Sequence, residues 1–145
     1  MRRILVLAAL ATILAGCVSV EDVPKTEGAD RTVAVQMRDN HFEPDELEVR
    51  RGETIAFRFT NRGSVRHDAF IGDAEEQKGH EREARMADDD EHGGGHGGEE
   101  STAITLEPGG RATLTYTFDE RGEILIGCHE PGHYEDGMVA KITVE

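Results

Sequence analysis

The segment at residues 127–138 constrains this chain most. It reads Gly-Cys-His-Glu-Pro-Gly-His-Tyr-Glu-Asp-Gly-Met, so that Cys128, His133 and Met138 have the spacing C-x4-H-x4-M. Strand-like apolar sequence precedes it at 123–126 and follows it at 139–144. A single loop between two strands can therefore hold a thiol, an imidazole and a thioether close together.

These three side chains suit copper. A thiolate, two imidazoles and a weak, distant thioether are the donors of a blue copper electron-transfer site. The loop supplies only one imidazole in this pattern, so a second His is required from elsewhere. His67 is the candidate, because it lies in the strand-like segment 65–72, directly after the clearest strand of the sequence at 54–60.

The N-terminus resembles an export signal. Arg2 and Arg3 precede an apolar run at 4–14 that is too short to span a bilayer. The run closes on Leu-Ala-Gly-Cys at 14–17, which is similar to the bacterial lipobox, whose Cys is acylated. We predict a lipoprotein signal peptide at 1–16 and lipidation of Cys17. The alternative is an ordinary secretory signal, and in both cases the protein is exported, to the periplasmic or cell-surface face of a membrane.

Export limits what the two cysteines can do. Disulfides form outside the cytoplasm, but a lipidated Cys17 leaves Cys128 without a partner in the chain. A lone thiol in an oxidising compartment is easily oxidised unless a metal holds it. The cysteine count therefore favours a metal on Cys128.

The net charge of the chain limits the kinds of partner that it can bind. The formal net charge of -14 argues against nucleic acid and against electrostatic adhesion to anionic lipid. It suits metal ions or a basic redox protein, although a high charge also simply keeps a small exported domain soluble.

Short strands separated by turns fill most of the sequence. Residues 17–30 are polar and aperiodic and are predicted to be a tether, and residues 31–145 the folded domain. Alternating segments predict strands at 32–37, 47–49, 54–60, 65–72, 103–106, 112–118, 123–126 and 139–144, with a turn at 41–44. These seven or eight strands predict a β-sandwich or barrel. The expected core includes Phe42, Ile55, Phe57, Phe59, Phe70, Leu114, Tyr116 and Phe118.

Residues 73–100 differ from the rest. They carry 11 acidic side chains against 3 basic ones, and residues 92–98 are a Gly/His low-complexity run. Residues 74–87 could form a helix, but its apolar face is thin. We predict a flexible, solvated acidic insertion. The insertion has four potential metal donors, which are either incidental or form a weak second copper site: His80, Met86, His92 and His96.

From residue 32 to residue 145, the chain resembles a cupredoxin, a member of the small blue copper family that includes plastocyanin and azurin. The resemblance rests on the 127–138 segment and on the strand pattern around it. It implies an all-β, Greek-key sandwich with one type 1 copper, held by His67, Cys128, His133 and Met138. The loop and the acidic insertion look closest to bacterial periplasmic cupredoxins linked to copper tolerance.

Three residues near the expected ligands need comment. Asp68 departs from plastocyanin and azurin, in which an Asn follows the first His and helps to pin the two ligand segments together. An Asp accepts hydrogen bonds but has no amide donor. We expect His129 to be a surface residue or a neighbour of the ligands rather than a ligand, and His41 to be structural or exposed.

The resemblance implies a monomeric carrier of single electrons between redox proteins, such as a cytochrome or an oxidase, with His133 as the exit route. The alternative is a protein that binds or sequesters copper in copper tolerance. An enzyme is not expected, because the sequence offers no further His clusters. Zinc would fit Cys, His and His, but Met138 argues against it as the native metal.

Overall fold

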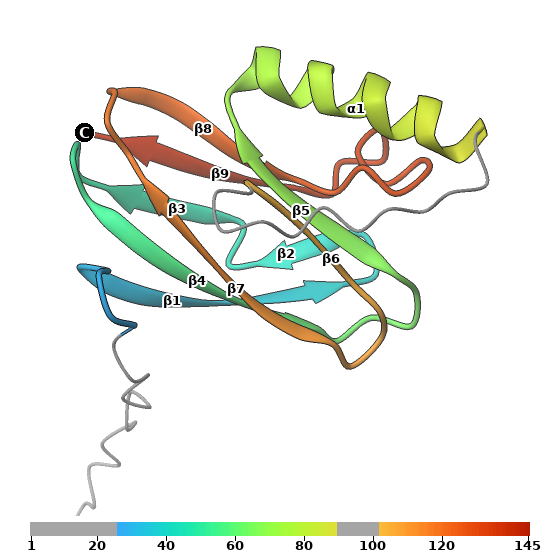
Figure 1. Cartoon of the computed structure of the whole chain (residues 1–145), viewed down its shortest axis with the longest axis horizontal. Helices are drawn as coiled ribbons and strands as arrows, with labels where there is room; N and C mark the ends of the chain where they lie inside the picture. Colours follow the sequence, from blue (N-terminus) through green and yellow to red (C-terminus); the bar gives the residue numbers. More distant parts are fainter. Residues whose placement is uncertain (1–25, 90–101) are drawn as a thin grey trace, which may run out of the picture.

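Two β-sheets lie face to face in the computed structural model, which describes residues 26–89 and 102–145 (Figure 1). One sheet has four strands, in the order β2 (His41–Glu43), β1 (Arg31–Arg38), β4 (Thr54–Asn61) and β7 (Arg111–Thr117). The other has five strands, in the order β3 (Glu46–Val49), β9 (Val139–Val144), β8 (Gly122–Gly127), β5 (His67–Gly72) and β6 (Ala103–Leu106).

The strand pairing is mixed. β1 runs parallel to β4 and β3 runs parallel to β9, whereas the other pairs are antiparallel. The all-β sandwich is therefore confirmed. The described residues contain nine strands, one more than the upper expectation, because residues 41–43 pair with β1 instead of forming only a turn.

Alternation along the strands builds the core between the sheets. In β4, Ile55, Phe57 and Phe59 are buried, and Phe57 meets Phe118 edge to face with ring centroids 6.3 Å apart. One expected core residue is placed differently. Phe70 is only partly buried, because its ring stacks on His80 of the helix instead of facing the other sheet.

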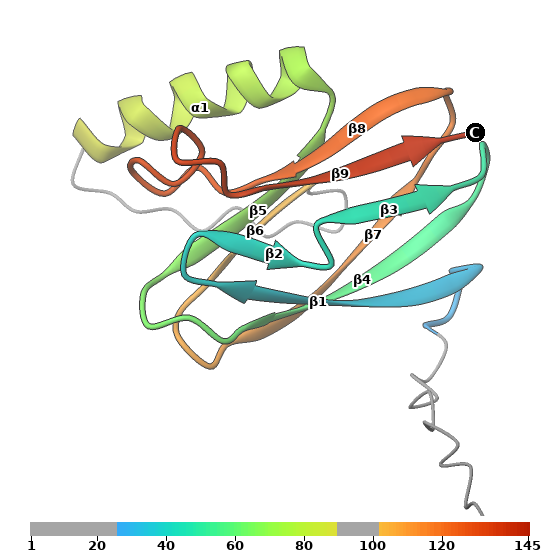
Figure 2. The same ribbon diagram turned by 180° about the vertical axis from the view of Figure 1, so that it is seen from behind.

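Residues Ala74–Asp89 form the helix α1, which lies beside β5, β8 and the loop between β8 and β9 (Figures 1 and 2). Its start is capped by Asp73, whose Oδ1 accepts hydrogen bonds from the backbone N–H groups of Glu75 and Glu76. The Glu76 carboxylate accepts the N–H of Asp73 in return, which completes a capping box. The cap fixes where the helix begins, immediately after β5.

The helix changes the interpretation of the acidic insertion. Gln77 on α1 is fully buried, so one face of this helix packs against the sandwich, whereas residues 73–100 were expected to be a wholly solvated insertion. The predicted signal peptide, Cys17, His92 and His96 lie outside the described residues. No helix in the described ranges, 26–89 and 102–145, is long and apolar enough to cross a membrane.

Candidate metal centre

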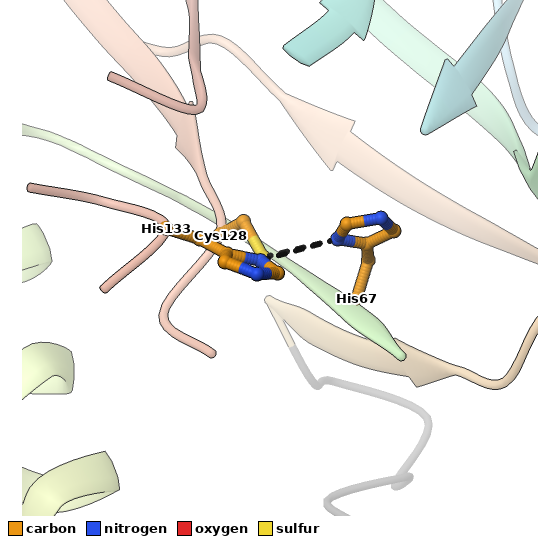
Figure 3. A group of neighbouring side chains, drawn as sticks. All are labelled: His67, Cys128 and His133. Carbon is orange, nitrogen blue, oxygen red and sulfur yellow. Dashed lines mark hydrogen bonds between the residues drawn. The ribbon is translucent and has the colours of Figure 1, made fainter. Parts of the chain in front are cut away.

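Three donor atoms meet at one end of the sandwich. His67 begins β5, Cys128 directly follows β8, and His133 lies in the loop that leads to β9 (Figure 3). The Nδ1 atoms of the two imidazoles are 3.3 Å apart, and the Cys128 Sγ lies 3.8 Å from Nδ1 of His67 and 3.4 Å from Nδ1 of His133. All three atoms lie within 4.8 Å of one another.

These separations fit one small metal ion. Bonds of about 2.0–2.3 Å at near-tetrahedral angles hold nitrogen and sulfur donors roughly 3.3–3.7 Å apart. The three observed distances lie close to this range. A thiolate, two imidazoles and a thioether bind copper in preference to hard, oxygen-seeking cations.

The loop is folded back on itself so that its two ends touch. The N–H of Cys128 donates to the carbonyl of Met138 at 3.1 Å, and the N–H of Met138 donates to the carbonyl of His133 at 2.9 Å. Gly132 and Gly137 have φ values of 85° and 91°, in the left-handed region that favours glycine. Met138 is fully buried in the same apolar cluster as Cys128, and its backbone hydrogen bonds hold it next to both Cys128 and His133.

His67 is a neutral imidazole at neutral pH. It is fully buried, and this burial is the largest cause that lowers the pKa of His67, although the hydrogen bond with Asp39 acts in the opposite direction. A neutral ring keeps a lone pair available to a metal.

Cys128 is held as a thiol until a cation arrives. Burial is the largest cause that raises the pKa of Cys128, and the charge of Asp68 adds to it. Hydrogen bonds from the backbone N–H groups of Glu130 and Asp68 act in the opposite direction. A bound metal ion deprotonates such a thiol, so the sulfur is inert without metal and becomes a strong donor with it.

Asp68 joins the two ligand segments. Its Oδ1 accepts the backbone N–H of His129, which ties β5 to the residue after Cys128. An acceptor is what this position uses, so the missing amide donor of an Asn is not needed for the link. On the outside, Arg66 forms two hydrogen bonds to the carboxylate of Glu130, at 2.7 and 3.0 Å.

Asn61 fixes the loop that leads into His67, a role that was not predicted from the sequence. Its buried amide donates to the carbonyls of Val65 and Leu106, both at 2.8 Å, and its Oδ1 accepts the N–H of Gly63. The only sequence signal was a polar residue at the end of the strongest strand, and this did not distinguish a buried amide from a turn.

His129 points away from the donors and into the contact with α1. It is buried, its Nε2 lies 2.7 Å from Oε1 of Gln77, and its Nδ1 pairs with Glu81. Its ring stacks on Tyr134 with centroids 4.5 Å apart. The structure therefore places His129 beside the candidate ligands but not on the surface. His41, in contrast, is exposed on β2.

The residues predicted to form a second copper site lie in different surroundings. His80 stacks on Phe70 at 4.2 Å, and its Nε2 lies 3.5 Å from Asp68. Met86, further along α1, is 70 % exposed. His92 and His96 lie outside the described residues, so a second site stays a prediction.

Comparison with known proteins identifies the family of this chain. A family model described as a cupredoxin-like domain matches residues 4–84, more than half of the chain. The copper-resistant cuproprotein CopI of Pseudomonas aeruginosa is 31 % identical over 140 residues, covering 81 % of this chain and 77 % of the relative. CopI of Rubrivivax gelatinosus is 34 % identical over 117 residues, covering 80 % and 67 %.

Solved structures agree with this placement. Reduced auracyanin from the photosynthetic bacterium Roseiflexus castenholzii is 25 % identical with a TM-score of 0.66, covering 81 % of this chain and 99 % of that one. An azurin from Methylomonas sp. strain J, at 14 % identity, has a TM-score of 0.61 over 81 % of this chain and 99 % of its own, and shares the fold alone.

The family model ends before the loop that carries Cys128. The donors that this loop brings together with His67 are nevertheless of the kinds that bind copper. The sheets, the converging donors and the relatives lead to one conclusion. This chain belongs to the cupredoxin family, whose fold binds copper.

Proposed function

We propose that this protein is an exported type 1 copper protein that carries single electrons between redox partners. Its copper is held by His67, Cys128, His133 and Met138. One observation carries the proposal: two imidazole nitrogens and a thiol sulfur, contributed by β5 and by the loop after β8, lie within 4.8 Å of one another.

The surroundings of these donors suit rapid electron transfer. Copper supplies a one-electron couple between Cu(I) and Cu(II) when it is bound. The protein keeps His67 and Cys128 fully buried and holds their backbones through Asp68 and Asn61, so the donors move little between the two states. His133 is only partly buried and is the proposed contact for the partner, whereas the other donors are shielded from water.

The finer parts of the proposal come from the sequence. We place the protein outside the cytoplasm, anchored by lipid on Cys17, with residues 17–30 as a tether. Its partners are proposed to be basic redox proteins, because the chain carries a formal charge of -14. It has no expected role with nucleic acid, and we propose that it acts as a monomer.

A second candidate function is the binding or sequestration of copper in copper tolerance. It is favoured by the relatives from Pseudomonas aeruginosa and Rubrivivax gelatinosus, which are named copper-resistant cuproproteins. A carrier needs one copper and a reversible couple. A buffering protein gains from additional, weaker sites such as the predicted set on the acidic insertion.

The first experiment is a titration of the mature protein with Cu(II), followed by visible absorption. The proposed site predicts an intense thiolate-to-copper charge-transfer band that saturates at one equivalent and is lost in Cys128→Ser. Uptake of several equivalents without that band would contradict the site.

Electron exchange separates the two functions. A carrier is expected to reduce or oxidise a basic cytochrome rapidly and reversibly. Slow exchange, together with more than one copper per chain, would favour sequestration.

A further inference from the structure

An acidic side chain lies behind His67, on the side opposite the other donors. Asp39 is in the turn between β1 and β2, and its Oδ1 is 3.4 Å from Nε2 of His67. Nδ1 of the same ring faces Cys128 and His133. The two nitrogens of His67 therefore have different neighbours, one a set of metal donors and the other a carboxylate.

The Asp39 carboxylate is fixed although its side chain is 54 % exposed. Oδ1 accepts the backbone N–H of Ser64 at 2.8 Å, and Oδ2 accepts the Ser64 hydroxyl at 2.7 Å. The hydroxyl is the largest cause that lowers the pKa of Asp39, followed by the Ser64 N–H, so the carboxylate is ionised at neutral pH. Ser64 lies three residues before His67, and the loop that carries the imidazole thus also holds its acidic neighbour.

Gly63 leaves the space in which the two side chains meet. A Cβ atom at this position would lie 2.7 Å from Nε2 of His67 and would also collide with Oδ1 of Asp39. The backbone there is fixed, because the N–H of Gly63 donates to Oδ1 of Asn61 at 2.8 Å and to the carbonyl of Met37 at 3.1 Å. The contact between Asp39 and His67 is therefore built into the loop.

We propose that Asp39 is a positioning residue for His67: its carboxylate accepts the Nε2–H, directs the Nδ1 lone pair towards Cys128 and His133, and favours Cu(II) over Cu(I). Histidine ligands commonly donate their second N–H to a carboxylate, carbonyl or water, which sets the tautomer and makes the ring a stronger donor. The inference rests on the proposed copper site, and it adds a residue that the donor set itself does not include.

The sign of the effect follows from charge. A negative group near the metal stabilises the more positive Cu(II) state, so its removal raises the reduction potential. Because Asp39 is half exposed and screened by solvent, we expect Asp39→Asn to lower the preference for Cu(II) over Cu(I) by about threefold to tenfold. A tenfold change corresponds to about 59 mV for a one-electron couple.

The first test is the reduction potential of the copper-loaded mature protein, wild type against Asp39→Asn, measured by voltammetry at low ionic strength. Asp119→Asn is the matched control. It removes the same charge from an exposed position before β8, at the end of that strand opposite Cys128. The proposal predicts a positive shift in Asp39→Asn that clearly exceeds the shift in Asp119→Asn. Equal shifts in the two variants would overturn the charge effect.

The second test needs no metal. Long-range proton–nitrogen NMR of the metal-free protein reads the tautomer of His67 directly. We expect the Nε2–H form in the wild type and in Asp39→Asn, whose amide oxygen still accepts, and a mixture of tautomers in Asp39→Ala. A wild-type ring protonated at Nδ1, or the same tautomer ratio in Asp39→Ala, would overturn the positioning role.

The role of Asp39 and the proposed copper site can fail independently in these two tests. If the wild type forms no thiolate-to-copper band, the proposed function fails, and the NMR result still decides whether Asp39 orients His67. If the band forms and Asp39→Asn behaves as Asp119→Asn does, the copper site stands and the charge effect attributed to Asp39 falls.

Discussion

The sulfur of Cys128 is buried, although metal binding requires it to be ionised. Burial and the charge of Asp68 raise its pKa, whereas burial lowers the pKa of His67. In the metal-free protein, the Cys128 thiol therefore keeps its proton near neutral pH, whereas the His67 imidazole is neutral. Metal binding must displace the thiol proton, which makes the affinity depend on pH.

We expect the Cu(II) affinity of the wild type to rise about tenfold for each pH unit between about pH 7 and 8.5, because one proton leaves Cys128. Competition with a chelator of known affinity at several pH values measures this slope. Cys128→Ser should bind weakly and show a shallower slope. An affinity of the wild type that is independent of pH in this range would mean that the thiol is already ionised.

Asn61 gives a prediction on stability. Asn61→Ala removes the amide that bonds the carbonyls of Val65 and Leu106 and leaves the N–H of Gly63 with the carbonyl of Met37 alone, at a cost of about 3 kcal/mol in the free energy of unfolding. Denaturant unfolding of the metal-free protein measures the loss. Gln36→Ala is the control, since that amide makes an exposed hydrogen bond to Arg38 and its loss should cost about 0.5 kcal/mol or less. Equal losses in the two variants would contradict the role of Asn61.

At the scale of elements, α1 is attached through a polar side chain. The Gln77 amide donates to the carbonyls of Phe70, Gly72 and Leu125 at 3.0–3.3 Å, and its Oε1 faces Nε2 of His129. One residue thus links the helix to β5, to β8 and to the residue after Cys128. A buried amide with all its hydrogen bonds made holds an interface in a single arrangement.

We expect Gln77→Ala to detach α1 from the sandwich, because the three carbonyls and Nε2 of His129 lose their hydrogen bonds to Gln77, at a local cost of about 3 kcal/mol. Hydrogen exchange should accelerate in residues 74–89 while β4 and β7 stay protected. Lys78→Ala, at the neighbouring and exposed position, should leave the exchange of the helix unchanged. Protection of α1 that survives in Gln77→Ala would contradict this attachment.

The strands and the loop donors could be predicted from the sequence, but the packing of α1 could not. Alternation predicted β4 closely and β6 to the residue, because strand periodicity follows burial and both strands face the core. The donors of the loop could be found because their spacing is local. The docking of α1 could not, because its inward residues Gln77, His80 and Glu81 are polar and look like any solvated face.

Asp39 was missed for a different reason. It lies 28 residues before His67, and only the pairing of β1 with β2 and β4 brings its turn to the imidazole. A contact of this kind depends on the register of strands, whereas the sequence indicated only that the strands exist. His67 itself was expected from its place after the strongest strand, and it does lie against Cys128.

For the molecule as a whole, the dominant property is its charge of -14. We expect electron exchange with a basic cytochrome to slow about tenfold as the ionic strength rises from roughly 0.01 to 0.15 M, because salt screens the attraction that steers encounter. Stopped-flow kinetics measure this rate. An uncharged small-molecule oxidant should show almost no dependence on salt. A rate with the cytochrome that does not change with salt would show that the charge has no part in choosing partners.

The separation of the donors along the chain sets an order of events. His67 and Cys128 are 61 residues apart, and strands of both sheets lie between them. A chain synthesised from its N-terminus carries His67 before Cys128, and the two meet only when β5 and β8 are paired. The complete set of donors therefore forms only in the folded protein, so that the full copper affinity expected of this site reports correct folding.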